Sequence, residues 1–242
     1  MRLEPRLTVD LGCGTGRQTA GLRQRYPEAA VVAVDLAEGM LTEARRRDMP
    51  GPAPGWLCAD VTALPLADRS ADLLISNLTL QWCLDPEALF TGLLRVLRPG
   101  GLLLFSTFGP DTLGELRASW AEVDDRNHVN AFFDLHDIGD ALVRAHFADP
   151  VMDCERITLT YPDVVGLMRD LKAIGAHNVT EGRPRGLTGR QALVTLAEAY
   201  ATFRRPDGTL PATYEVVYGH AWRAPADQGE AALPAAALRR PR

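Results

Sequence analysis

Short apolar runs alternate with longer amphipathic stretches along the first 107 residues. The apolar runs read as strands, and they lie at Leu7–Leu11, Val31–Asp35, Trp56–Asp60, Ala71–Ser76 and Leu102–Thr107. The stretches between them have helical spacing, and Asp85-Pro86 is typical of a helix start, with a cap followed by proline at the first helical position. Continuous apolar strands alternating with helices indicate an α/β fold, a mainly parallel sheet with helices on both faces.

The pattern changes after Thr107. Asp111 is expected to cap a helix with Leu113, Leu116 and Trp120 on one face, and a second helix carries Ile138, Ala141, Leu142 and Ala145. Strands are predicted at Arg156–Tyr161 and Ala212–Trp222. Between them, residues 162–210 read as a helical insertion before the last strand, with helices at Val164–Ile174 and Arg190–Phe203. We therefore predict one domain over residues 1–223 and a disordered Ala/Pro/Arg-rich tail over 224–242.

Composition narrows the function classes. The chain has 242 residues, of which 46% are hydrophobic and 24% charged, as in an ordinary globular protein. Its net charge of −5 gives no overall basic field for nucleic acid. No apolar run approaches the roughly 18 residues of a membrane span. We therefore expect no membrane segment. The four cysteines, Cys13, Cys58, Cys83 and Cys154, have no metal-ligand spacing, so we expect neither a disulfide nor a metal site. Cysteines without a disulfide framework fit a cytoplasmic location.

The stretch "VDLGCGTG", Val9–Gly16, places three glycines directly behind the first predicted strand. A strand, a glycine turn and a helix form a nucleotide-binding corner, because glycines let the backbone approach a ligand and the helix start presents free N–H groups. Dinucleotide enzymes use G-x-G-x-x-G in this place. Here Gly12, Gly14 and Gly16 give G-x-G-x-G, and Arg17 stands where the dinucleotide motif has its last glycine, which argues against NAD.

Three polar residues strengthen this interpretation, since each is predicted to end a strand at the edge where such sheets bind ligands. Asp35 ends the second strand, Asp60 the third and Asn77 the fourth. Each acid alone is equally consistent with a helix cap or a surface charge. Cys13 has no activating base beside it and is expected to pack as a small side chain rather than act as a nucleophile. Met40 packs either on a ligand or in the core.

The glycine motif resembles motif I of the class I S-adenosylmethionine (SAM) methyltransferases, which have a Rossmann-like seven-stranded sheet. In that family Asp35 matches the acid that binds the ribose, Asp60 the acid near the adenine, and Asn77 a residue that holds SAM and faces the substrate. The resemblance implies a SAM site at Asp10, Gly12, Cys13, Gly14, Gly16, Asp35, Leu36, Met40, Asp60, Val61 and Asn77.

Nearly the whole chain resembles the malonyl-acyl-carrier-protein O-methyltransferases of biotin synthesis. Matching stretches include "SNLTLQWCLDPEALF", "HVNAFFDLHDIGDALV", "LMRDLKAIGAHNV", "RGLTGR" and "DGTLPATYEVVYGHAW", several of them outside the cofactor motifs. The resemblance implies a monomer that methylates the free carboxylate of a malonyl thioester on a carrier protein or on coenzyme A. The methyl ester hides the charge so that the primer can be elongated toward pimeloyl.

Such a reaction needs no general base, because a malonyl carboxylate with a pKa near ~3–4 is already ionised. Positioning and electrostatics therefore carry catalysis. Candidates for holding the substrate are the polar residues that follow the strands or lie in subfamily-like stretches, namely Gln81, Trp82, Asp111, Thr112, His128, Asn130, Lys172, His177, Asn178 and Tyr214. Any one of them alone is equally consistent with a cap, a buried hydrogen bond or a surface charge. Arg183, Arg185 and Arg190 form a basic loop that is either solvated surface or a docking site for an acidic carrier protein.

Two departures from the family pattern stand out. Family members usually carry helices ahead of the glycine motif that cover the SAM pocket, whereas here the motif begins at Val9, so we expect these lid helices to be missing through a late start codon or truncation. His146 occupies a position where glycine would relieve a left-handed helix end. Three other functions are alternatives: a protein like the mitochondrial complex I assembly factors associated with arginine hydroxylation, a SAM-binding remnant without activity, and a quinone or other small-molecule methyltransferase. The "HVN", "GAHN" and "RGLTGR" stretches favour the biotin enzyme over the first, and the subfamily-like stretches argue against the last.

Overall fold

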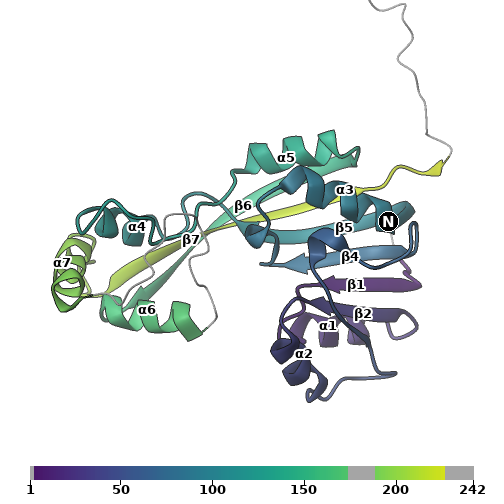
Figure 1. The fold of residues 1–242 in the computed structure, drawn as a ribbon, viewed down its shortest axis with the longest axis horizontal. Coiled ribbons are helices and arrows are strands. Elements are labelled where there is room, and N and C mark those ends of the chain that lie inside the picture. Colours follow the sequence, from purple (N-terminus) through teal and green to yellow (C-terminus); the bar gives the residue numbers. More distant parts are fainter. Residues whose placement is uncertain (1–2, 174–188, 227–242) are drawn as a thin grey trace, which may run out of the picture.

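The computed structural model describes residues 3–173 and 189–226, which build one seven-stranded sheet in the order β3-β2-β1-β4-β5-β7-β6 (Figure 1). The strands are β1 Leu7–Leu11, β2 Ala30–Asp35, β3 Gly55–Cys58, β4 Ala71–Asn77, β5 Leu97–Phe108, β6 Ala148–Tyr161 and β7 Leu210–Trp222. The helices are α1 Arg17–Arg25, α2 Glu38–Arg45, α3 Pro86–Val96, α4 Gly114–Ala121, α5 Leu135–Arg144, α6 Val164–Ala173 and α7 Arg190–Ala201, with 3₁₀ turns η1 Val61–Ala63 and η2 Leu80–Trp82.

The sheet is mixed but mainly parallel. Strands β1 to β5 run parallel to one another, and β7 lies antiparallel between β5 and β6. The carboxyl ends of the five parallel strands meet at one edge, where the order reverses between β1 and β4, and ligands of such sheets bind there. The predicted fold class, including helices α6 and α7 before the last strand, is confirmed.

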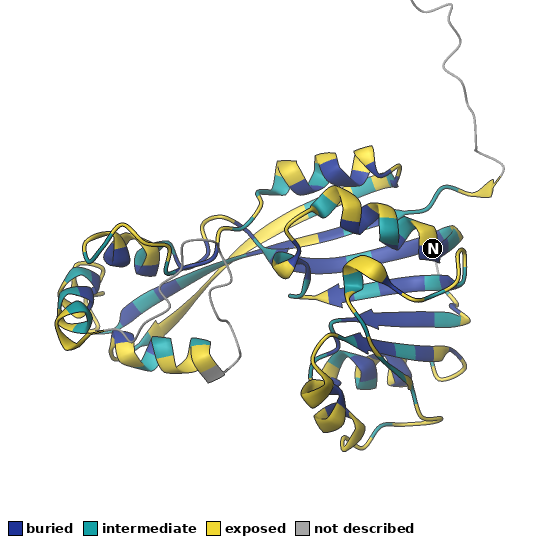
Figure 2. Ribbon diagram, viewed as in Figure 1, coloured by how far each residue is buried: buried dark blue, intermediate teal, exposed yellow. Residues whose placement is uncertain are grey.

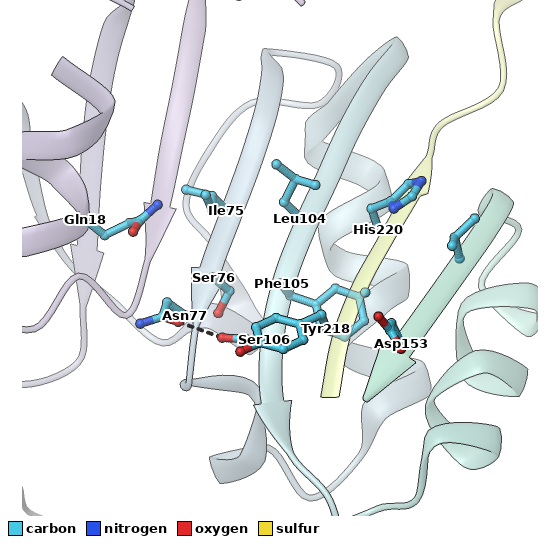
Figure 3. Close-up of a pocket in the computed structure, with 12 residues that line it drawn as sticks. Gln18, Ile75, Ser76, Asn77, Leu104, Phe105, Ser106, Asp153, Tyr218 and His220 are labelled. Carbon is cyan, nitrogen blue, oxygen red and sulfur yellow. Dashed lines mark hydrogen bonds between the residues drawn. The ribbon is translucent and has the colours of Figure 1, made fainter. Parts of the chain in front are cut away.

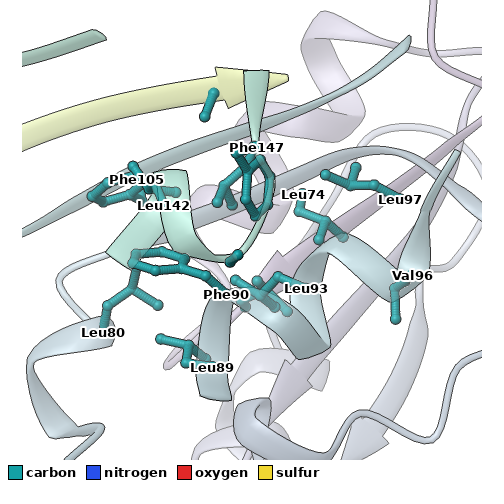
Figure 4. Close-up of a cluster of buried hydrophobic side chains, with 14 of the residues drawn as sticks. Leu74, Leu80, Leu89, Phe90, Leu93, Val96, Leu97, Phe105, Leu142 and Phe147 are labelled. Atoms are coloured by element: carbon teal, nitrogen blue, oxygen red, sulfur yellow. The ribbon is translucent and has the colours of Figure 1, made fainter. Parts of the chain in front are cut away.

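One face of the sheet is covered by α3 and α5, and the main hydrophobic core lies beneath them (Figure 4). Local signals start both helices: the Asp85 carboxylate accepts from the Ala88 N–H ahead of α3, and the Asp134 carboxylate accepts from the Asp137 N–H ahead of α5. Phe90 of α3 contacts the aromatic ring of Phe105 with the ring centroids 5.8 Å apart. This packing fixes β4 and β5, whose ends carry part of the site.

The opposite face is covered unevenly. Helix α1 contacts β1 and β2, and α2 contacts β2 and β3. Over β4, β5, β7 and β6, by contrast, an open cleft of about 340 Å³ is lined by residues such as Gln18, Ile75, Leu104, Tyr218 and His220 (Figure 3). Within the described ranges, helices therefore cover this face only on its β1–β3 side.

Strands β6 and β7 continue beyond the rest of the sheet as a two-stranded ribbon. Val216–Trp222 of β7 pairs with β5, whereas Leu210–Glu215 pairs with β6 alone. Most of β6 is exposed, as Figure 2 shows. Helices α4, α6 and α7 gather around the far end of the ribbon (Figure 1) and enclose a second hydrophobic cluster: Leu113, Leu116, Trp120, Val129, Val164, Leu167, Leu196, Tyr200, Leu210 and Ala212.

The starts of β6 and α4 and the end of α5 test three local predictions. Strand β6 begins at Ala148, eight residues before the predicted Arg156, because it pairs with β7 along almost its whole length. The prediction that Asp111 caps a helix is wrong: α4 begins after Leu113, whose φ is 54°, without a side-chain cap. The left-handed helix end at His146 is confirmed, with φ 65° and the Phe147 N–H donating to the Leu142 carbonyl.

Candidate active site

The glycine loop between β1 and α1 turns on three left-handed residues, Gly12, Gly14 and Gly16, with φ of 70°, 52° and 78°. At Gly12 a Cβ would overlap the side chain of Thr79, with the Thr79 Cβ only 2.6 Å away. At Gly14 a Cβ would meet no atom within 4 Å. The loop therefore packs tightly against the end of β4 at Gly12 and leaves open space at Gly14, where a ligand can approach the backbone.

Asp35 ends β2 beside this loop. Its carboxylate accepts hydrogen bonds from the Gly14 N–H and the Ala37 N–H, both at 2.8 Å. The two bonds fix the carboxylate at the carboxyl edge of the sheet, and each oxygen retains a second lone pair for a ligand hydroxyl. Asp35 thus orders the glycine loop, and its free lone pairs face the edge where a ligand can approach.

Asp10 and Cys13 lie beneath the loop and are buried. The Asp10 carboxylate accepts from the Thr19 hydroxyl at 2.5 Å, and burial raises its pKa to about 6. Burial, with the nearby Asp10 and Asp35 carboxylates, raises the pKa of the Cys13 thiol to about 12, so the thiol stays protonated. Cys13 packs with Ala33 and Leu41, which supports the packing role and contradicts a nucleophile.

Asn77 at the end of β4 is held by β5. Its side-chain oxygen accepts from the Ser106 hydroxyl at 2.7 Å (Figure 3). The Leu78 N–H donates to the Ser106 carbonyl. Leu78 has φ 52°, a strained conformation for a branched side chain. The chain then enters the turn η2, and the Thr79 side chain lies against Gly12 of the glycine loop.

The expectation that Asp60 ends a strand is wrong, because β3 ends at Cys58. Asp60 instead caps the turn η1: its Oδ1 accepts from both the N–H and the hydroxyl of Thr62, which lowers the pKa of the carboxyl. It still lies at the same edge of the sheet. Leu36 and Met40 are 71% and 41% exposed there, so Met40 is not a core residue. Val61, in η1, packs partly against the main core.

A second cavity, of about 60 Å³, lies between the end of β5 and the helices on the ribbon. Gln81 and Trp82 follow Asn77 by only four and five residues, so the chain leads directly from the glycine corner into this cavity. Its walls take Leu113, Leu116 and Val129 from the second hydrophobic cluster. They contain six of the ten residues proposed for substrate positioning, and the full lining is Gln81, Trp82, Phe108, Thr112, Leu113, Leu116, His128, Val129, Asn130, Phe132, Leu171 and Tyr214.

Similarity to known proteins identifies the family to which this chain belongs. Residues 9–105 match a family model described as a methyltransferase domain. The malonyl-[acyl-carrier protein] O-methyltransferase of Laribacter hongkongensis is 54% identical, over 92% of this chain and 77% of the relative, and that of Gallionella capsiferriformans is 53% identical over 92% and 79%. The chain belongs to the malonyl-[acyl-carrier protein] O-methyltransferase family. It is a SAM-dependent methyltransferase by this membership.

Solved structures agree on the fold alone. The YcgJ protein of Bacillus subtilis matches with a TM-score of 0.63 at 14% identity, over 90% of this chain and 92% of that chain. A SAM-dependent methyltransferase of Mesorhizobium loti matches with a TM-score of 0.53 at 21% identity, over 90% and 91%. In the part of the chain that the structure describes, no helix is both long and apolar enough to cross a membrane.

The glycine corner fits the family's cofactor. Its open space above Gly14 admits a ligand, the Asp35 carboxylate can accept from a ribose, and the exposed Leu36 and Met40 offer an apolar surface for an adenine. A buried anion at Asp10 favours a ligand that carries positive charge nearby. When bound, SAM supplies an electrophilic methyl group on a cationic sulfonium.

Several residues that the sequence analysis predicts to position the substrate or dock the carrier do not line this cavity. Asp111 is exposed and forms an ion pair with Arg156, and Lys172 is exposed near the end of α6; neither lines the cavity. His177, Asn178, Arg183 and Arg185 fall outside the described residues. Arg190 is exposed at the start of α7.

Among the residues that line the cavity, hydrogen bonds to the protein distinguish a structural side chain from one with a polar atom left for a ligand. The Thr112 hydroxyl donates to the Glu215 carbonyl and accepts from the Glu215 N–H, so it holds its loop to β7. Burial raises the pKa of the Tyr214 phenol, so it stays neutral. Gln81 donates through Nε2 to the Leu78 carbonyl, while its buried Oε1 has no protein partner among the described residues.

Sequence reasoning missed two residues that contact His128. The Trp120 ring stacks on the imidazole, with centroids 3.7 Å apart and planes at 2°, and the Asp124 carboxylate lies 2.8 Å from Nε2. The sequence pattern places Trp120 on the apolar face of a helix, and Asp124 lies among acidic residues typical of a surface loop. Residues 124–128 lie in an irregular loop after α4, where i, i+4 spacing predicts no pairing, so no sequence signal marks this contact.

Proposed function

We propose that this protein transfers the methyl group of SAM to the free carboxylate of a malonyl thioester on an acyl carrier protein. The observation that carries the proposal is the cavity directly beyond Asn77, lined by polar side chains and aromatic rings and connected to the glycine corner by one short turn. Relatives that are 54% and 53% identical bear this name. The product is the malonyl methyl ester, the disguised primer that the family supplies to biotin synthesis.

The reaction balances without a proton step. A carboxylate oxygen forms the new bond to the methyl carbon, the bond from that carbon to sulfur breaks, and the electron pair stays on the sulfur. The carboxylate is ionised at neutral pH, so the protein holds the oxygen, the carbon and the sulfur in line and offsets part of the desolvation of the carboxylate. The protonated Cys13 thiol and the neutral Tyr214 phenol are consistent with a site that needs no general base.

We assign docking of the carrier protein to a local group of positively charged residues. The chain as a whole is negative, and acyl carrier proteins are acidic, so attraction needs a basic patch. Arg190 is exposed at the start of α7, next to the second hydrophobic cluster that forms one wall of the cavity. We assign docking to Arg190 together with Arg183 and Arg185, with the prosthetic arm of the carrier entering the cavity.

The test incubates the protein with SAM and malonyl-carrier protein and weighs the carrier by mass spectrometry. The proposal expects one added methyl group on the malonyl thioester. Acetyl-carrier protein, which has no free carboxylate, is the control and should gain nothing. Binding of SAM without methylation of any malonyl thioester would contradict the proposal.

A further inference from the structure

A substrate carboxylate in the cavity needs a positively charged partner, and few lining residues can supply one. Among its described lining residues there is no arginine or lysine, and His128 is the only one that can become a cation. Its side chain is only 10% exposed, so a charge there acts at short range in a largely water-free setting.

His128 is held from two sides. The parallel Trp120 ring fixes the plane of the imidazole, and Asp124 Oδ1 lies 2.8 Å from Nε2. Since a carboxylate only accepts, Nε2 carries a proton and donates it to Asp124. Hydrogen bonds from the Arg126 N–H and from His128 lower the pKa of Asp124, which therefore stays ionised as the acceptor for the ring.

Other charged or titratable groups near the ring are Asp125 and Arg126 on the same loop, Arg117 on α4 and the Tyr214 phenol on β7. The Arg117 guanidinium donates to the carbonyls of Pro110 and Thr112 at 3.0 and 3.1 Å and so braces the cavity wall. Tyr214 stays neutral. Asp124 is thus the charge in direct contact with the ring.

We propose that His128, positioned by Trp120 and Asp124, is the residue that binds the malonyl carboxylate and distinguishes the acid substrate from its methyl ester product. This assignment rests on the proposed function. The imidazolium attracts the carboxylate in the substrate complex. Methyl transfer removes that negative charge, and Asp124 then remains to balance the imidazolium, so the ester loses its main attraction and leaves.

The test compares binding of malonyl-coenzyme A with binding of its methyl ester, both by calorimetry in the presence of S-adenosylhomocysteine, which has no methyl group to transfer. The phosphates of coenzyme A are common to both ligands and cancel in the ratio. In His128→Gln the affinity for the acid should fall about ten- to hundredfold, as expected for loss of one charged hydrogen bond, and the affinity for the ester should change less than about twofold.

His136→Gln is the matched control, because His136 is 90% exposed and lies 3.9 Å from Asp134, outside the cavity. It should leave both affinities unchanged. Asp124→Asn, which removes the carboxylate that holds the ring, should also weaken binding of the acid more than binding of the ester. Asp124 is on the surface, so this variant keeps the test valid if His128→Gln is poorly folded.

Equal losses for acid and ester in His128→Gln would show a structural role and overturn the assignment, as would an unchanged acid affinity. Either result leaves the proposed function standing if the parent protein methylates malonyl thioesters. Absence of that methylation overturns the function itself, so the two failures are distinguishable.

Discussion

Alanine at Gly12 and at Gly14 should destabilise the protein by different amounts, because the two sites share a backbone conformation and differ in space. Both have positive φ, which costs a residue with a Cβ roughly 1–2 kcal/mol. At Gly14 the Cβ meets nothing within 4 Å, whereas at Gly12 it overlaps the Thr79 side chain. Forcing an atom into packed structure costs a further ~1–3 kcal/mol. Gly12→Ala should therefore lose about 2–5 kcal/mol of folding free energy and Gly14→Ala about 1–2 kcal/mol.

The measurement is urea denaturation followed by circular dichroism, without SAM, so that ligand contacts do not enter. A second variant pair separates the overlap from the backbone strain: all three atoms near the added Cβ belong to the Thr79 side chain, so Thr79→Gly should remove the overlap. Gly12→Ala should then cost about 1–3 kcal/mol less in the Thr79→Gly background than in the parent. Equal destabilisation at Gly12 and Gly14, or no coupling to Thr79, would refute the reasoning.

Three further predictions concern ligands and pH. Asp35→Ala should weaken SAM binding by a few kcal/mol, at ~1.5–3 for each charged hydrogen bond lost, and undiminished affinity in calorimetry would remove Asp35 from the cofactor site. Burial raises the pKa of Asp10 to about 6 from 3.8, so the folded state binds this proton more tightly than the unfolded state, and stability falls as pH rises from about 4 to 6, by up to about 3 kcal/mol. Asp10→Asn, which keeps an acceptor for Thr19, should lack this fall in urea titrations at pH 4 and pH 7, and profiles parallel to those of the parent would contradict the assignment. Changing Arg183, Arg185 and Arg190 together to glutamate should raise the Michaelis constant for malonyl-carrier protein, most at low salt, while malonyl-coenzyme A is affected much less; equal loss on both substrates would count against docking.

The cofactor half could be predicted from the sequence because its signals are local. Short apolar runs mark β1, β2 and β4, and Asp35 and Asn77 are the last residues of β2 and β4, whereas β5 begins at Leu97, five residues before the predicted Leu102. Asp60 was misplaced by two residues, since "LCAD" does not show that pairing with β2 ends at Cys58.

The substrate half depends on contacts between distant segments. Asp111 has the sequence of a helix cap, yet Arg156, 45 residues later, takes its carboxylate, and Glu215 binds its N–H. The length of β6 follows from its pairing with β7 and not from its own alternation, which begins only at Arg156. The order of His, Asn, Gln and Tyr along the chain likewise does not reveal that Gln81, His128 and Tyr214 surround one cavity.

The two-stranded ribbon separates the acceptor pocket from the cofactor corner, so the two can open and vary in sequence independently. The cofactor corner rests on the main core, whereas α4, α6 and α7 enclose their own cluster at the far end of β6 and β7. Cooperative unfolding units tend to follow such separate clusters. The ribbon end can therefore open locally to admit a carrier's arm without loss of the glycine corner, and amide hydrogens of α6 and α7 should exchange faster than those of β1 and β4. Substitutions in the second cluster can reshape the acceptor pocket at little cost to methyl-donor binding, so acceptor choice and donor binding are separable properties of one sheet.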